Sequence, residues 1–413
     1  MEFFLARQPI FDRDRQVFGY EMLFRSSLRN VYDGGDSSRS SRSVIMHSFF
    51  SSMGVEDVLD HKRAFFNFDR EVLLDETALL LPKDRVVIEI LDNVAPDAEV
   101  IRQCGILKDR GYTLALDDFV DGPQLAGLLE LADIIKVDVL ATPLQEQRRL
   151  VDRYARRGIT MLAEKIETPE AFAQAQHTGY RYFQGYFFAR PAVLRGKEIP
   201  GLKVNYARLL GELNGPHLDI ARLEEVLRQD VGLSYRLLKY LSSPLFGFRR
   251  QIESLPQALM LLGEANLRKW FSLAVLAALG EDKPRELVIS ALLRAFFCES
   301  LAAQAGLQAQ SGEMFLLGLF SHLDAFLDRP FEKALAEVDI PAAIGDVLTG
   351  SSNAPAELAA IYEVVCCYEK GHWDTCLLAD ARLTAPDSPE GARDLRGLYL
   401  DALHSIRQVF QTL

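Results

Sequence analysis

The sequence Thr113-Leu-Ala-Leu-Asp-Asp-Phe119 places two adjacent acids directly after a short apolar run. A continuous apolar run is typical of a parallel strand that is buried on both faces. The carboxylates of Asp117 and Asp118 would then lie where the chain leaves the sheet. Two neighbouring carboxylates repel each other unless a cation or a shared proton lies between them. For one such pair alone, two solvated acids that begin a turn are the preferred interpretation.

The same pattern recurs throughout residues 1–195, where each apolar run ends in a polar residue. An opening hairpin is expected over Phe3–Ile10 and Gln16–Arg25, and in its second arm a period of two places Phe18 and Tyr20 on the face opposite Glu21. The later runs are Ala64–Asn67, Arg85–Glu89, Leu114–Asp118, Ile134–Asp138, Thr160–Glu164 and Tyr182–Gln184. About 20 to 30 residues separate successive run ends, enough for one crossover helix each. The pattern predicts a TIM-like (β/α) barrel with the strand ends gathered at one mouth.

The residues that end these runs predict a functional site at the mouth. Converging carboxylates cost stability unless a cation offsets them. The expected set comprises Glu21, Asn67, Glu89, Asp117, Asp118, Lys136, Glu164 and Gln184.

Carboxylate and amide oxygens are hard ligands that suit Mg²⁺ or Mn²⁺. Two ions that share Asp117 would favour in-line displacement at phosphorus by an activated water. Lys136 would orient that water or offset charge in the transition state, and Arg25 would hold a second phosphate.

Composition limits the classes of function. Of 413 residues, 49% are apolar and 25% are charged, an ordinary balance for a soluble protein. A net charge of −12 argues against binding of nucleic-acid polymers, but not against a small phosphate ligand. Five scattered cysteines and the lack of a signal-peptide pattern favour a reduced, cytoplasmic protein. The longest apolar stretch, Trp270–Leu279, is too short to span a membrane.

Several ordered motifs in residues 1–195 resemble the EAL family of cyclic di-GMP phosphodiesterases. They are Tyr20-Glu-Met-Leu-Phe-Arg25, Asn67, Val87-Ile-Glu-Ile-Leu-Asp92, Asp117-Asp-Phe119, Ile135-Lys-Val-Asp138, Ala163-Glu-Lys-Ile-Glu-Thr168 and Phe183-Gln-Gly-Tyr-Phe-Phe-Ala-Arg-Pro191. The resemblance implies hydrolysis of cyclic di-GMP to linear pGpG, and it makes a homodimer possible. By the same resemblance, one metal ion is bound by Glu21, Asn67, Glu89 and Asp117, and a second by Asp117 and Asp118.

The resemblance also assigns roles around the metals. It implies that the arrangement of water and outer ligands is completed by Lys136, Glu164, Glu167 and Gln184. It implies that the nucleotide is contacted by Gln8, Arg25 and Pro191.

Five departures from the family pattern lie around this set. Single substitutions are Met22 for Ala, Asp69 for Ser, Asp92 for Glu and Lys165 for Gly, and the loop Val120–Gln124 replaces a Gly-x-Gly loop. The residues expected to bind metal are kept, while the residues that support them are changed. An inactive cyclic di-GMP receptor, or an interaction scaffold, is therefore the alternative to an enzyme.

Residues 196–413 are predicted to be helical and to form a second domain. Three stretches resemble the HDOD domain: Asp230–Leu238, Ser242–Gly247 and Ile252–Gly263. The expected helices include Leu255–Leu262, Glu264–Leu279, Arg285–Ala305, Glu313–Leu327, Pro341–Leu348, Pro355–Glu369 and Pro389–Phe410, after earlier ones at Asp219–Gln229 and from Leu233. The sequence has no His-Asp dipeptide, so we expect this domain to regulate the barrel or bind a protein partner.

Overall fold

The computed structural model describes residues 4–25, 61–75, 77–187, 223, 237, 255–280, 282–336, 340–383 and 393–412. The chain divides into two compact units, one formed by Met1–Arg190 with Cys367–Leu377 and the other by Pro191–Cys366 with Leu378–Leu413. The predicted domain boundary between residues 195 and 196 lies outside the described residues and stays a prediction. The predicted helices at Asp219–Gln229 and from Leu233 have only residues 223 and 237 described.

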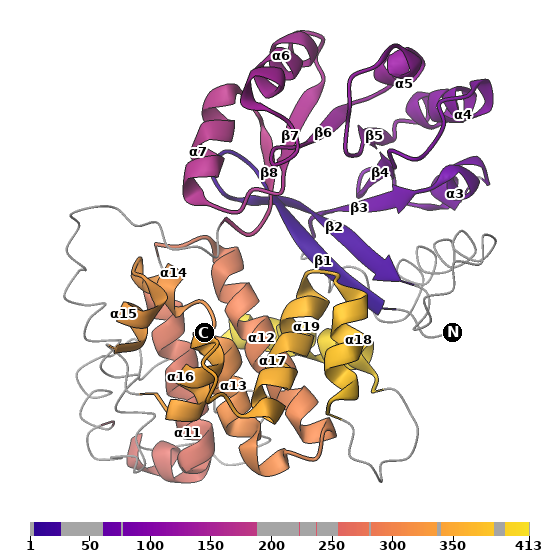
Figure 1. Cartoon of the computed structure of the whole chain (residues 1–413). Coiled ribbons are helices and arrows are strands. Elements are labelled where there is room, and N and C mark those ends of the chain that lie inside the picture. Colours follow the sequence, from indigo (N-terminus) through magenta and orange to yellow (C-terminus); the bar gives the residue numbers. More distant parts are fainter. Residues whose placement is uncertain are drawn as a thin grey trace. The chain divides into compact units, whose positions relative to one another are not determined.

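The first unit contains a closed barrel of eight strands that neighbour one another in chain order (Figure 1). The strands are β1 (Phe4–Phe11), β2 (Val17–Arg25), β3 (Arg63–Phe68), β4 (Val86–Ile90), β5 (Thr113–Leu116), β6 (Ile134–Asp138), β7 (Thr160–Glu164) and β8 (Tyr182–Gln184). Strand β1 runs antiparallel to β2 and β8, and the other neighbours are parallel. The predicted TIM-like barrel and its opening hairpin are confirmed.

Short helices connect the strands and cover the outside of the barrel. They are α3 (Arg70–Leu74), η1 (Thr77–Leu80), α4 (Ala98–Asp109), η2 (Pro123–Leu125), α5 (Ala126–Leu129), α6 (Leu144–Ala155) and α7 (Pro169–Thr178). Local sequence sets several ends. The Asp97 side chain accepts the amide hydrogens of Glu99 and Val100 at the start of α4, and α7 ends at Gly179 in the left-handed region, with φ 110°.

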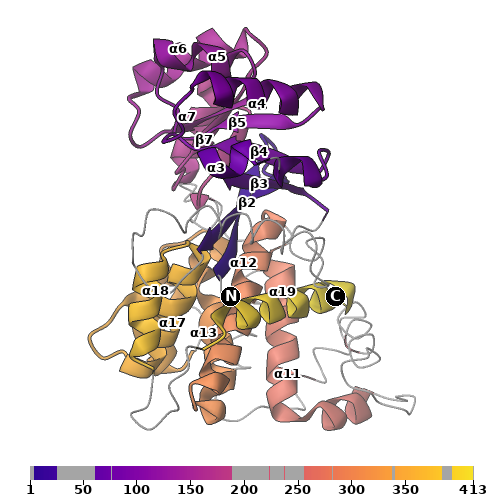
Figure 2. The same ribbon diagram turned by 90° about the vertical axis from the view of Figure 1, so that its right-hand side faces the viewer.

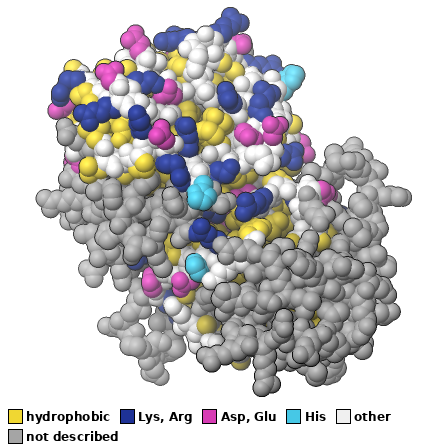
Figure 3. All heavy atoms as spheres, turned by 180° about the vertical axis from the view of Figure 1, so that it is seen from behind, with side chains coloured by type: hydrophobic (Ala, Val, Ile, Leu, Met, Phe, Trp, Pro, Cys, Tyr) yellow, Lys and Arg dark blue, Asp and Glu magenta, His cyan; other side chains and the backbone are white. Residues whose placement is uncertain are grey.

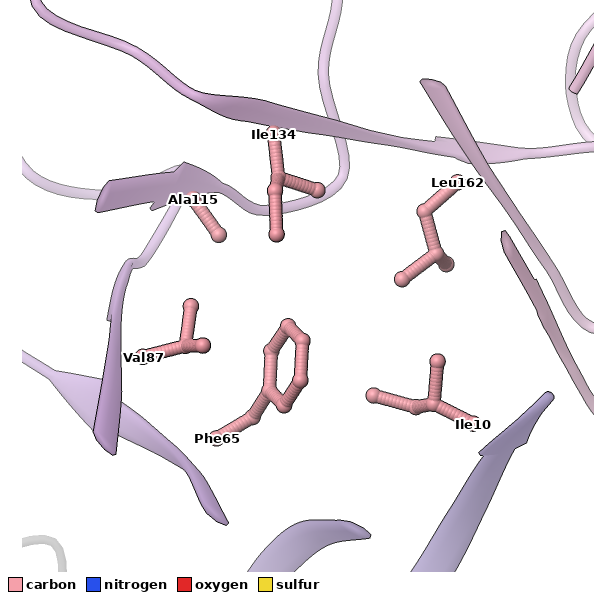
Figure 4. Close-up of a cluster of buried hydrophobic side chains, with 6 residues drawn as sticks. All are labelled: Ile10, Phe65, Val87, Ala115, Ile134 and Leu162. Carbon is pink, nitrogen blue, oxygen red and sulfur yellow. The ribbon is translucent and has the colours of Figure 1, made fainter. Parts of the chain in front are cut away.

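The interior of the barrel is a layer to which each strand contributes one side chain. Figure 4 shows six of them, which point toward one another: Ile10, Phe65, Val87, Ala115, Ile134 and Leu162. Phe18 of β2 and Tyr182 of β8 pack against this layer, and their rings stack at 4.0 Å. Such a layer closes the barrel below its mouth.

The expected alternation along β2 is wrong at Phe18. The pairing of β1 with β2 shifts between Ile10, opposite Gly19, and Phe11, opposite Val17, so Phe18 is an extra residue. This bulge turns Phe18 toward the barrel interior, although a strict period of two placed it on the face opposite Glu21.

The second unit is helical, as predicted (Figure 2). The helices assigned here are α11 (Leu255–Leu279), α12 (Arg285–Gln304), α13 (Ser311–Phe320), α14 (Leu323–Leu327), α15 (Phe331–Ala336), α16 (Ala342–Thr349), α17 (Ala356–Glu369), α18 (Trp373–Ala381) and α19 (Leu395–Thr412), with a short η4 (Gln308–Gln310). The end of α17 and the start of α18 belong to the first unit. No described helix is long and apolar enough to cross a membrane.

Helix α12 is the centre of the second unit and packs against α13 and α19. Its residues Glu286–Cys298 are all buried, as expected of a helix surrounded by others. Gly318 allows close approach, since a methyl group there would lie 2.3 Å from the carbonyl carbon of Arg294. The predicted helix Glu313–Leu327 is wrong in one respect, because it is interrupted between α13 and α14. Helices α15 and α18 were not predicted.

Candidate active site at the barrel mouth

The strand-end residues converge because strands alternate their side chains. In six strands, the polar residue lies two positions beyond the residue of the interior layer and therefore points the same way. The pairs are Phe65 and Asn67, Val87 and Glu89, Ala115 and Asp117, Ile134 and Lys136, Leu162 and Glu164, and Tyr182 and Gln184. Glu21 of β2 joins the same ring because it is paired with Gln8, which lies two positions before Ile10 of the interior layer.

Lys136 is the centre of this site. Its ammonium lies 3.2 Å from Glu21 Oε2, 3.0 Å from Asp117 Oδ1 and 2.8 Å from Glu164 Oε1, and it also contacts Glu89 Oε1. The Lys136 side chain is 1% exposed. Four carboxylates thus surround a single buried cation, an arrangement with an excess of negative charge.

Amide side chains position the carboxylate of Glu21. Asn67 Nδ2 donates to Glu21 Oε1 at 3.2 Å, and Gln184 Nε2 donates to Glu21 Oε2 at 2.6 Å. Gln184 Nε2 also donates to Gln8 Oε1 at 2.9 Å, which brings Gln8 of β1 into the site. These hydrogen bonds use the amide nitrogens of Asn67 and Gln184. The side-chain carbonyl oxygens of the two residues can therefore accept a hydrogen bond or bind a cation.

The crowding of acids shifts their protonation. Burial, reinforced by the neighbouring carboxylates, raises the pKa of Glu89 well above its ordinary value. Burial likewise raises the pKa of Glu164, to about 7. Burial also acts to raise the pKa of Asp117, but the charge of Lys136 and hydrogen bonds from Glu89 and Lys136 outweigh it and leave that pKa lowered. One lysine therefore does not keep every acid in the ring ionised.

The residues of the ring fit a divalent metal ion. Glu21, Glu89 and Glu164 each offer a carboxylate oxygen, and these oxygens lie within 4.8 Å of one another. Four buried oxygens of the ring have no hydrogen-bond partner among the described residues: Asn67 Oδ1, Glu89 Oε2, Glu164 Oε2 and Gln184 Oε1. A buried oxygen without a partner is costly, and a hard cation is the ligand that such a set of oxygens prefers.

The other predicted site residues do not lie in the buried ring or fall outside the described part. The Asp118 carboxylate is 46% exposed and lies 3.5 Å from the ammonium of Lys165. Glu167 is exposed after β7. Pro191 and the side chain of Arg25 lie outside the described residues.

Lys165, expected to be glycine in the family, has φ +57°, in the left-handed region that glycine adopts most readily. Its ammonium lies 2.6 Å from Asp138 Oδ2 and 3.5 Å from Asp118 Oδ1. The substitution therefore adds a positive charge beside an acid that the family pattern assigns to a metal.

The altered loop Val120–Gln124 is held by contacts that sequence reasoning missed. Asp121 accepts hydrogen bonds from Tyr154 Oη at 2.6 Å, from Arg153 at 2.7 Å and from Arg149 at 3.2 Å. The three donors lie on α6. The signal available in the sequence was that Arg149 and Arg153 are four residues apart and therefore lie on the same face of a helix. Asp121 thus anchors to α6 the loop that follows Asp117 and Asp118.

The fold and the site define a protein with a β/α barrel, whose mouth carries acidic residues that fit a metal ion, followed by a helical domain. The EAL domain family matches residues 60–191, and the HDOD domain family matches residues 199–337. Over 384 residues, 91% of this chain and 93% of the relative, the chain is 35% identical to the uncharacterized protein YuxH of Bacillus subtilis. It is 34% identical over 373 residues, 90% of this chain and 85% of the relative, to the cyclic di-GMP phosphodiesterase CdgJ of Vibrio cholerae.

The chain therefore belongs to the family of proteins that combine an EAL domain with an HDOD domain. Both resemblances expected from the sequence are confirmed. Among solved structures, the manganese and cyclic di-GMP complex of Klebsiella pneumoniae BlrP1 is 24% identical, with a TM-score of 0.39, and the match covers 46% of this chain and 55% of that one.

Proposed function

We propose that this protein binds cyclic di-GMP at the barrel mouth and hydrolyses one of its phosphodiester bonds to give linear pGpG. The observation that carries the proposal is the ring of Glu21, Glu89, Asp117 and Glu164 around the buried Lys136. The relative CdgJ, which aligns over most of both chains, is a cyclic di-GMP phosphodiesterase.

The proposed cofactor is Mg²⁺ or Mn²⁺. Glu21, Asn67, Glu89 and Asp117 would hold one ion, and Asp117 with Asp118 a second. When bound, such ions polarise the phosphoryl oxygens and activate the attacking water. The choice of a hard divalent ion is supported by the carboxylate oxygens of Glu21, Glu89 and Glu164, which lie within 4.8 Å of one another, and by the buried ring oxygens that have no hydrogen-bond partner within the described part of the chain.

The protein's own residues hold the carboxylates of the ring in place and transfer protons. Lys136 provides a fixed positive charge within the ring, suited to stabilising charge that develops on phosphate. Glu164 has a pKa of about 7, and its Oε2 has no hydrogen-bond partner among the residues that the structure describes, so this side chain can accept a proton near neutral pH. Gln184 holds Glu21 through a bond of 2.6 Å, which keeps that carboxylate aimed into the ring.

A receptor that binds the dinucleotide without cleaving it is the second candidate. Lys165 favours it, since its ammonium lies 3.5 Å from Asp118 and competes there with a second cation.

Mixed charge on the barrel surface, seen at the top of Figure 3, suits a small ligand better than a nucleic-acid polymer. In either case the helical unit would regulate the barrel or bind a protein partner, and the homodimer stays a prediction.

The test is to incubate the purified protein with cyclic di-GMP and Mg²⁺ or Mn²⁺ and to follow pGpG by chromatography. We expect turnover that EDTA abolishes and that Glu21→Ala lacks, because Glu21 contacts Lys136, Asn67 and Gln184. Glu130→Ala, at an exposed acid of the same unit, is the matched control and should retain turnover.

Binding of cyclic di-GMP in Ca²⁺ is measured in parallel, and circular dichroism confirms that the helical unit of each variant is folded. Tight binding without turnover would support the receptor. A protein that neither binds nor cleaves the dinucleotide would overturn both candidates.

A further inference from the structure

A short segment from near the C-terminus forms part of the barrel unit. Residues Cys367–Leu377, the turn between α17 and α18, group with Met1–Arg190 rather than with the helical unit. They lie outside the ranges that match the EAL and HDOD families, 60–191 and 199–337. Neither family pattern therefore assigns them a role.

Specific hydrogen bonds fasten this segment to the barrel. The buried hydroxyl of Tyr368 donates to the Leu5 carbonyl at 3.1 Å and lies 3.4 Å from the Leu5 amide nitrogen. The Tyr186 hydroxyl donates to the carbonyl of Glu369 at 3.1 Å. The segment thus bonds to β1 and to the residues that follow β8, which are neighbouring strands of the barrel.

Glycine allows the turn to lie against β2. Gly371 has φ +70°, and a methyl group there would lie 3.1 Å from Leu23 Cδ1. The amide of His372 donates to the Cys367 carbonyl at 2.8 Å, which closes the turn before α18. The turn presents Lys370 and Trp373 on either side of the glycine.

A cavity of about 280 Å³ lies between this turn and the barrel mouth, and it is lined by Leu23, Asn67, Asp69, Leu91, Lys370, Gly371 and Trp373. Asn67 also donates to Glu21 of the acidic ring, so the cavity adjoins the proposed metal site. Leu91 lines in addition a second cavity, which contains Asp117 and Asp118. The first cavity is smaller than a site for a whole drug-sized ligand, and it suits one base of a dinucleotide.

The lining has the chemistry that recognises guanine. The indole of Trp373 is held edge-on to the ring of Tyr368, with centroids 5.1 Å apart, and an aromatic ring in such a cavity is a stacking surface for a base. Lys370 is the one cation among the described lining residues, and its ammonium lies 5.8 Å from the ring centroid of Tyr186. Lysine is a natural donor to the O6 and N7 acceptors of guanine.

We propose that Lys370 and Trp373 form a subsite for one guanine base of the ligand. The base stacks on Trp373, and Lys370 donates to its O6 and N7 edge. This inference rests on the proposed function, because guanine is the base of the proposed ligand, cyclic di-GMP. It makes the C-terminal turn a specificity-determining part of the barrel mouth.

The test measures equilibrium binding of cyclic di-GMP and cyclic di-AMP in Ca²⁺ to the full chain. Loss of a stacked base predicts that Trp373→Ala weakens cyclic di-GMP binding about tenfold or more. Lys370→Ala should weaken cyclic di-GMP about tenfold and cyclic di-AMP much less, because adenine presents an amino group where guanine presents O6. His372→Ala, at an exposed residue of the same turn that does not line the cavity, should bind like the wild type.

Fluorescence gives an independent readout, because the chain has two tryptophans and Trp270 is fully buried in the other unit. Cyclic di-GMP should change the emission of the wild type but not that of Trp373→Phe, which keeps a stacking ring and should keep most of the affinity. Wild-type protein that binds no cyclic di-GMP would overturn the proposed function and this subsite together. Wild-type binding that Trp373→Ala and Lys370→Ala both leave unchanged would overturn the subsite alone.

Discussion

The raised pKa of Glu164 predicts that the metal-free barrel loses stability as the pH rises through neutrality. The perturbation is Glu164→Gln, which keeps the shape of the protonated side chain but cannot ionise. Glu164 is 9% exposed and lies 2.8 Å from Lys136, so its titration is governed by the buried ring rather than by solvent. The comparison isolates one group, because the rest of the chain titrates in both proteins.

The magnitude follows from the pKa, which burial raises from an ordinary 4.5 to about 7. Because the folded state binds this proton more tightly than the unfolded state, the contribution to stability is fully present below pH 4.5 and is lost as the pH rises to about 7. At about 1.4 kcal/mol per pH unit, the loss is about 3 kcal/mol. Wild type and Glu164→Gln should therefore be similar at pH 4.5, and the wild type about 3 kcal/mol less stable at pH 8.

The assay is urea unfolding in EDTA at several pH values, followed by circular dichroism, with the barrel transition fitted separately from that of the helical unit. Mg²⁺ at pH 8 should narrow the difference between the proteins, since a cation in the ring favours the ionised carboxylate. A stability difference that does not change with pH would refute the reasoning. So would a Glu164→Gln protein less stable than the wild type at pH 8 in EDTA.

Two further predictions test the supports of the site and of the helical unit. Asp121→Ala should lower turnover of cyclic di-GMP about tenfold and lower the melting temperature, because it removes the bonds from Tyr154 and Arg153 that hold the loop. Asp152→Ala, exposed on the same helix, is its control, and equal turnover in the two variants would contradict the anchoring role. Gly318→Ala should destabilise the helical unit by about 1–3 kcal/mol in thermal unfolding, since its methyl group would lie 2.3 Å from Arg294. In the same helix Gly312→Ala has open space and should be neutral or stabilising, and a similar loss in both would show that close approach is not the cause.

The sequence determined the barrel and most of its acidic ring, because both depend on local periodicity. Strands alternate their side chains, so a polar residue two positions beyond an apolar one must share its face, as Glu89 does with Val87. Parallel strands with crossover helices place such ends at one mouth. The same rule was wrong at Phe18, where one extra residue shifts the pairing of β1 with β2.

Long-range packing decided the rest. The pattern placed Lys136 at the mouth, but only the folded barrel brings four carboxylates around its ammonium and raises the pKa of Glu164. The sequence alone also did not predict that Asp121 is bonded to α6, or that residues 367–377 belong to the barrel unit. Local sequence carries the period of a strand, whereas contacts such as that of Tyr368 with Leu5, 363 residues apart, exist only after the chain has folded.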